Sequence, residues 1–201
     1  MKSRFKSVGI VVAVVCSALL IVAWPKPIPS GPATAPASEP SDPAAVDPAV
    51  DWPLPEGWWG STEFGVRLLA PAGWQVSHRQ GRDYLDRVPG SPREGNLCVV
   101  SIPNMRRLSF DQIVEENRRV FDDAPGLETI EMEPGALDGH QVLWTEFLAT
   151  ELATGARYHC RGIVFVRGND QVVLTLTVDA DRWDDLSDTA TAVFDSLELR
   201  P

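Results

Sequence analysis

The chain has 201 residues, of which 44% are hydrophobic and 23% charged, a composition typical of a globular protein. This length suits one folded domain but not two once the ends of the chain are removed. Acidic residues outnumber basic ones by 28 to 18, which gives a formal charge of −10. A general nucleic-acid-binding protein needs a basic surface to offset the phosphate charge, so the charge balance argues against that class.

An apolar run near the N-terminus predicts a membrane anchor. Residues 8–24 are almost entirely Val, Ile, Leu and Ala, and no charged residue lies between Lys6 and Lys26. Seventeen residues in a helix at about 1.5 Å each span about 25 Å, enough for a short transmembrane segment. Three cations precede the run and one follows it. This excess of positive charge before the run predicts that residues 1–7 stay in the cytoplasm and that the chain after Trp24 is extracytoplasmic.

Two other interpretations of this run have weaker support in the sequence. A cleaved signal peptide needs small residues just beyond the apolar run, and Ala35-Pro36-Ala37, which fits that pattern, lies far downstream. A lipoprotein would be modified at Cys16, but Val14 and Val15 before it are too bulky for the usual motif. We therefore expect an uncleaved, single-pass signal anchor in the cell membrane.

Residues 25–57 form a proline-rich segment, which we predict to be a disordered linker. It contains ten of the 17 prolines, among Ala, Ser, Asp and Glu, and cannot form a core. About thirty residues in stiff polyproline geometry, at about 3.1 Å each, would reach about 100 Å. A solvated spacer is favoured here over a proline-recognition motif.

The remaining residues, 58–201, are predicted to form one extracytoplasmic domain. Strands are expected over residues 64–70, 74–77 and 97–102. Ser109 with Gln112 forms a capping-box pattern that opens a helix. Its apolar side chains recur on one face, as in an amphipathic helix: Phe110, Ile113, Val114, Val120 and Phe121.

The C-terminal half predicts an antiparallel meander followed by a second helix. Strands are expected over residues 141–149, 158–167 and 171–178, with a tight hairpin at residues 168–170. The last strand alternates apolar and polar residues, which predicts one buried and one wetter face. Asp181 is expected to cap a helix whose apolar stripe contains Trp183, Leu186, Ala190, Val193, Phe194 and Leu197. Two helices on an antiparallel sheet make an α+β fold.

This order of elements resembles a known family. Phe64 followed by Pro71-x-Gly73-Trp74, a central helix, a meander and a closing helix that ends in Phe194-Asp195-Ser196-Leu197 are similar to the PsbP-like α/β/α sandwich. The resemblance covers residues 62–199, and the family includes bacterial membrane-tethered extracytoplasmic proteins. It implies a binding or scaffolding module and supplies no shared catalytic residues.

Cys98 and Cys160 fall within predicted strands outside the membrane, where disulfides persist. We predict a bridge between them, worth about 4 kcal/mol on the chain-entropy model. Two alternatives stay open at this point. The cysteines could be two buried thiols, or one could be a catalytic thiolate with His78, His140 or His159 as its base.

The sequence predicts neither a metal site nor a cofactor. The histidines lack the spacing of a zinc motif, although Glu146 or Glu151 could join them, and His159 and the adjacent Cys160 should point to opposite faces of the sheet. The acidic run near the second helix is better explained by capping than by cation binding: Asp179, Asp181, Asp184, Asp185 and Asp188. No nucleotide-binding loop or nucleophile-elbow motif is present, so no nucleotide is expected.

Arginines on either side of the first helix form the candidate partner face. We single out Arg106, Arg107 and Arg119 as a surface for an acidic partner, while Glu115 and Arg119 are spaced for an ordinary helix pair. Asn117 lies on the apolar face of the same helix. We interpret it as a hydrogen-bonded amide in the core, and the alternative is a polar group that lines a ligand cleft.

The favoured function is a membrane-tethered extracytoplasmic binding or scaffolding module of a bacterial envelope or secretion-associated complex, without catalysis. Its expected partner is a protein of the envelope. The alternative is a small-ligand or lipid-binding domain with a cleft between the sheet and the first helix.

Overall fold

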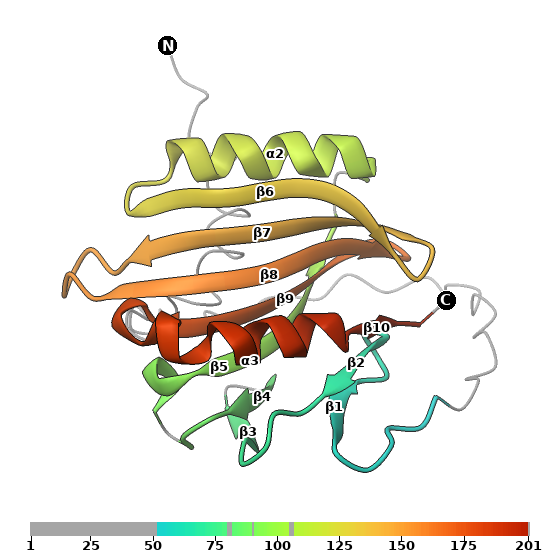
Figure 1. Ribbon diagram of the computed structural model, residues 1–201. Coiled ribbons are helices and arrows are strands. Elements are labelled where there is room, and N and C mark those ends of the chain that lie inside the picture. Colours follow the sequence, from blue (N-terminus) through green and yellow to red (C-terminus); the bar gives the residue numbers. More distant parts are fainter. Residues whose placement is uncertain (1–51, 80–81, 90, 105–106, 201) are drawn as a thin grey trace, which may run out of the picture.

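The computed structural model describes residues 52–79, 82–89, 91–104 and 107–200, which form two antiparallel sheets and two α-helices (Figure 1). The predicted cytoplasmic end, the membrane anchor and residues 25–51 of the linker lie outside this part. None of the helices within the described ranges is both long and apolar enough to cross a bilayer.

A seven-stranded sheet with the order β3-β4-β5-β9-β8-β7-β6 forms the centre of the domain. All of its neighbouring strands are antiparallel. The bounds are β3 Gln75–Arg79, β4 Arg82–Asp86, β5 Asn96–Pro103, β6 Leu127–Leu137, β7 His140–Thr150, β8 Arg157–Arg167 and β9 Asp170–Asp179. The predicted meander of β7, β8 and β9 is confirmed, and β6 extends it by one further strand.

The central helix explains the strand order. After β5 the chain enters α2 (Phe110–Asp123) and re-emerges as β6 at the far edge of the sheet. The meander then returns strand by strand until β9 pairs with β5. The crossover therefore places α2 over one face of the sheet, where Ile113 and Val114 pack against Leu143 of β7 and Val164 of β8.

The capping box predicted for α2 is present. The backbone N–H of Gln112 donates to Ser109 Oγ at 3.4 Å, and the N–H of Ser109 donates to Gln112 Oε1 at 2.9 Å. Near the other end of the helix Phe121 meets Phe147 edge to face, with 4.8 Å between ring centres. The predicted apolar face is thus the face that lies on the sheet.

The two faces of β9 correct one expectation. Val172, Leu174, Leu176 and Val178 lie in the core beneath α3, as predicted. The alternate residues are not on a wet face, because Thr175 and Thr177 are only 8% and 6% exposed. Helix α2 covers that side of the sheet, so a central strand is buried on both faces.

The second face carries α3 (Trp183–Asp195) together with a small three-stranded sheet of order β1-β2-β10. Its strands are β1 Trp58–Ser61, β2 Val66–Leu69 and β10 Glu198–Leu199. Asp181 does not cap α3 as predicted. Asp179 caps a short 3-10 turn, η2 (Ala180–Arg182), by accepting from the Asp181 N–H, and α3 follows directly from that turn.

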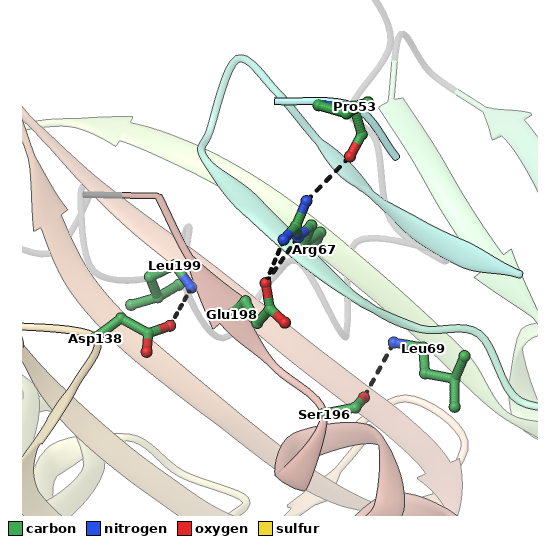
Figure 2. A network of polar contacts seen from close by, with 7 residues as sticks. All are labelled: Pro53, Arg67, Leu69, Asp138, Ser196, Glu198 and Leu199. Atoms are coloured by element: carbon green, nitrogen blue, oxygen red, sulfur yellow. Dashed lines mark hydrogen bonds and ion pairs between the residues drawn. The ribbon is translucent and has the colours of Figure 1, made fainter. Parts of the chain in front are cut away.

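A polar network joins the small sheet to the rest of the domain (Figure 2). Arg67 of β2 donates through Nε and Nη2 to Glu198 of β10 at 2.8 and 2.6 Å, and through Nη1 to the carbonyl of Pro53 at 3.0 Å. Asp138, at the β6–β7 hairpin, accepts from the N–H of Leu199 at 2.8 Å. The first described residues, the C-terminal strand and a hairpin of the large sheet are therefore tied together.

Candidate functional site

A charged cluster lies on the α3 face of the sheet, where β7 and β8 run side by side. Glu146 of β7 pairs in register with Arg161 of β8. Its Oε1 accepts from His159 Nε2 at 2.8 Å, and its Oε2 lies 3.8 Å from Arg161 Nε. Because a carboxylate only accepts hydrogen bonds, the pair fixes a proton on Nε2 of His159.

Aromatic side chains of α3 pack against both partners of Glu146, His159 and Arg161. The imidazole of His159 stacks on the Trp183 ring, with 3.6 Å between centres and 5° between planes. The guanidinium carbon of Arg161 lies 5.6 Å from the centre of the Phe194 ring, and its Nη1 donates to Thr191 Oγ1 at 3.2 Å. The helix thus fixes the orientation of both side chains.

An open pocket of about 220 Å³ lies beside this cluster, between the C-terminal end of α3 and strands β6, β7 and β8. Its lining combines carboxylates, aromatic rings and one guanidinium: Glu131, Trp144, Thr145, Glu146, Arg161, Gly162, Phe194 and Asp195. Trp144 meets Phe194 edge to face, with 6.2 Å between ring centres. The pocket is on the opposite side of the sheet from the cleft that the alternative function required.

The arrangement offers binding contacts but no activated nucleophile. A Glu–His pair can orient a general base, but covalent catalysis of the triad type also needs a hydroxyl or thiol within hydrogen-bond reach of that base. Within the described ranges, Glu146 is the only hydrogen-bond partner found for His159. Cys160, the next residue, packs with Phe121 and Phe147 on the α2 face. The prediction that His159 and Cys160 point to opposite faces is therefore confirmed.

The structure has no bond between Cys98 and Cys160, in disagreement with the predicted disulfide. Cys98 lies on β5 opposite Thr175, and Cys160 lies on β8 opposite Thr177, so β9 separates the two cysteines. Two strand spacings amount to about 9.5 Å, beyond the limit of about 7 Å between the Cα atoms of a bridge. The interpretation as two buried thiols is the one the structure bears out.

Burial also makes the Cys160 thiol unreactive. It is fully buried, which raises its pKa from 9.0 to about 12, while a contact with Thr177 acts weakly in the other direction. Only the thiolate is nucleophilic, so its reactive fraction at pH 8 falls about a thousand-fold. The structure therefore gives no support to a catalytic thiolate at this position.

The state of the two thiols can be tested by alkylation of the full chain with Cys16→Ser. Unfolded in denaturant without reductant, the protein should take up two labels, whereas the native protein at pH 8 should leave Cys160 unlabelled. Intact mass and peptide mapping would count and locate the adducts. A single population with no label after unfolding would show that the bridge forms.

The structure describes two of the three arginines of the predicted partner face. Arg106 lies outside the described residues, Arg107 is exposed before α2 with a positive φ of 50°, and Arg119 lies on the third turn of the helix. Arg119 pairs with Glu116 at 2.7 Å rather than with Glu115, which pairs with Arg118 at 3.1 Å. The i,i+4 pair that we predicted is replaced by two i,i+3 pairs.

The remaining candidates have structural roles. Asn117 is buried and donates through Nδ2 to the carbonyl of Ile113 at 2.8 Å, so it is a core amide. His140 Nε2 lies 2.9 Å from the carbonyl of Arg200. In the acidic run, Asp185 pairs with Arg182 at 3.2 Å. No group of three potential metal ligands is found among the described residues.

Most residues of the pocket were missed by sequence reasoning. Glu131, Trp144, Arg161 and Asp195 belong to four different elements and carry no motif. The sequence does contain one indication of the site. Glu146, Arg161 and the neighbouring His159 are polar residues in strands whose other residues are mostly apolar. Such residues indicate either a polar partner on the neighbouring strand or a binding site.

No protein-family model and no curated protein matches the chain. Among solved structures, the chain is similar to the cyanobacterial PsbP protein (CyanoP) of Synechocystis sp. PCC 6803, with a TM-score of 0.51 and 18% identity over 71% of this chain and 91% of that one. It is also similar to LpqN of Mycobacterium tuberculosis, which is described as involved in cell envelope biogenesis. That match has a TM-score of 0.50 and 14% identity over 68% of this chain and 83% of LpqN. At this identity the comparisons show the fold, and the predicted PsbP-like α/β/α sandwich is confirmed.

Proposed function

We propose that this protein is an extracytoplasmic binding or scaffolding module of a bacterial cell envelope, tethered to the membrane and without catalysis. Residues 8–24 would span the bilayer, and the proline-rich linker would hold the domain at a distance from it. The apolar run and its flanking cations support the anchor. The similarity of the fold to that of LpqN, which is described as involved in cell envelope biogenesis, supports the location.

The observation that carries this proposal is that the cysteine thiols of the domain are buried, away from the open pocket beside α3. The residues that line the pocket on the α3 face include no serine or cysteine, and its Glu146 is held by His159 and Arg161. Cys98 and Cys160 are buried in the clusters on the α2 face. A surface with fixed charges and aromatic walls but without a positioned nucleophile is suited to recognition rather than to bond breaking.

The topology can be tested by treating intact cells or spheroplasts with protease. The folded domain should be digested, and a membrane-bound stub that contains residues 1–24 should remain. Mature protein whose N-terminus lies at or beyond Ala35 would contradict the anchor. Protection of the domain in intact cells, with digestion only after lysis, would contradict the extracytoplasmic location.

The partner can be tested by photo-crosslinking in living cells. A photoreactive residue at Glu133, which is exposed beside the pocket, or at Arg107 reports on the two faces of the sheet separately. A probe at Asn169, on the exposed β8–β9 hairpin, is the matched control. We expect one defined envelope protein to crosslink from one face and not from the control. Equal labelling of the same proteins from all three positions would argue against a binding module.

The arginines around α2 are our second candidate contact surface, directed to an acidic partner. Reversal of charge in Arg106→Glu, Arg107→Glu and Arg119→Glu should abolish capture by a photoreactive residue at Asp111, which is exposed on the first turn of α2. The thermal midpoint should change little, because an i,i+3 helix pair such as Glu116–Arg119 is worth about 0.5 kcal/mol or less. Arg118→Glu, a reversal in the neighbouring i,i+3 pair with Glu115, is the control. Capture that survives the triple reversal would remove this face from consideration.

A further inference from the structure

The pocket beside α3 carries more negative than positive charge. Three carboxylates line it, those of Glu131, Glu146 and Asp195, against the single guanidinium of Arg161. Glu146 already contacts His159 and Arg161. Glu131 and Asp195, in contrast, form no ion pair with any residue that the structure describes. Two carboxylates at the pocket are therefore not neutralised within the domain.

The end of α3 adds to this negative potential. Asp195 is the last residue of the helix, and the last turn contains no basic residue. The carbonyl groups at a helix C-terminus carry a partial negative charge, so an acidic side chain there is unfavourable and a cation is stabilising. The domain thus bears an electrostatic cost at the rim of the pocket, which a bound cation would offset.

The walls of the pocket already accommodate one guanidinium group. Arg161 places its guanidinium carbon 5.6 Å from the centre of the Phe194 ring while its Nη1 bonds to Thr191. Trp144 provides a second aromatic wall. A planar guanidinium can stack on an aromatic ring and donate in its plane to carboxylates on more than one side, whereas an ammonium group is a compact point charge.

The size of the pocket restricts the ligand. Its volume of about 220 Å³ is below the roughly 300–1,000 Å³ typical of sites for drug-sized ligands. The space suits one extended side chain rather than a nucleotide or a lipid. An exposed side chain from a protein partner fits this size, and it also fits the scaffolding role.

From these observations we infer that the pocket of Glu131, Trp144, Glu146 and Asp195 receives an arginine side chain of a protein partner. The guanidinium would lie against the aromatic wall and donate to the carboxylates of Glu131 and Asp195. This inference rests on the proposed function and names the chemistry of the partner on the α3 face.

The inference can be tested by nitrogen NMR of the full chain in detergent micelles. The probe is the acetylated and amidated peptide Gly-Gly-Arg-Gly-Gly, and the comparison peptides carry citrulline or lysine in place of the arginine. The signal is the indole N–H of Trp144, assigned with the variant Trp144→Phe. We expect this resonance to shift with the arginine peptide, to stay unchanged with the isosteric but neutral citrulline peptide, and to shift less with lysine.

Matched variants separate the pocket from the general negative charge of the domain. Glu131→Gln with Asp195→Asn should weaken binding of the arginine peptide at least ten-fold. Asp122→Asn with Asp123→Asn removes the same charge from the end of α2, across the sheet, and should change binding less than two-fold. Added salt should weaken binding, since the contact is an exposed charge interaction.

Three results would overturn the inference. The first is no shift of the Trp144 resonance at about 10 mM arginine peptide, a concentration at which even millimolar affinity is visible. The second is equal binding of the citrulline or lysine peptide, and the third is an equal effect of the two double variants on binding. None of these results would contradict the proposed function. That function fails instead if no position of the domain crosslinks specifically to an envelope protein.

Discussion

Replacing Glu146 by alanine should lower the free energy of unfolding by about 2–4 kcal/mol, because it leaves the buried His159 side chain without its hydrogen-bond partner and the half-buried Arg161 without its counter-charge. The side chains of His159 and Glu146 are only 9% and 18% exposed. Arg161 would also lose its contact with Glu146 Oε2, which leaves its contacts with Thr191 and the Phe194 ring. Urea denaturation followed by circular dichroism would measure the loss.

Glu128→Ala is the matched control for this change. Glu128 lies on β6 and pairs with Arg157 at 3.7 Å, but these side chains are 71% and 55% exposed. An exposed pair of this kind contributes at most about 1 kcal/mol. Glu146→Gln, which keeps an oxygen for His159, should fall between the two. Equal losses in Glu146→Ala and Glu128→Ala would show that the cluster is not a stabilising unit.

A second large effect is expected from Phe165→Ala, which should cost about 3–5 kcal/mol. Phe165 is 1% exposed and lies in register between Val142 and Val172 in the core beneath α3. Removing the ring leaves a cavity that flanking strands cannot close. Ile130→Ala, at a β6 position that is 51% exposed, should cost less than about 1 kcal/mol by the same assay. A small loss for Phe165 would contradict this core assignment.

The elements that could be predicted from the sequence are those whose signals are local. The capping box of Ser109 and Gln112 fixes the start of α2, and the spacing of its apolar residues fixes the face that packs on the sheet. The hairpin between β8 and β9 follows from Gly168, which takes a positive φ of 59° in its two-residue loop. In each case the determining residues lie within a few positions of one another.

Strand β6 was missed because it lies at the edge of the sheet. Its residues are mostly exposed, and Pro134 and Gly135 in its middle read as a turn. Proline is tolerated at an edge, where its missing N–H would face solvent. The pair Asp138-Gly139, with φ values of 49° and 81°, is a strong hairpin signal that could have revealed the strand.

The candidate site and the state of the cysteines depend on strand order, which has no local signal. Cys98 and Cys160 both fall in strands, but the insertion of β9 between β5 and β8 keeps them apart. The same long-range pairing brings Glu131 of β6 and Asp195 of α3 to one pocket. Residue types alone could suggest these groups but could not show which of them meet.

Under the proposed function, in which the linker holds the domain by its N-terminal side, the polar network around Arg67 has a mechanical consequence. Arg67 holds the carbonyl of Pro53 and stacks on Trp52, with its guanidinium carbon 4.4 Å from the ring centre. A pulling force applied at residue 52 would therefore act first on Arg67 and through it on Glu198. Strand β10 is joined to β2 at only two register positions, whereas β8 and β9 share ten. Under load the small sheet would yield first, and the seven-stranded sheet with its pocket would remain folded.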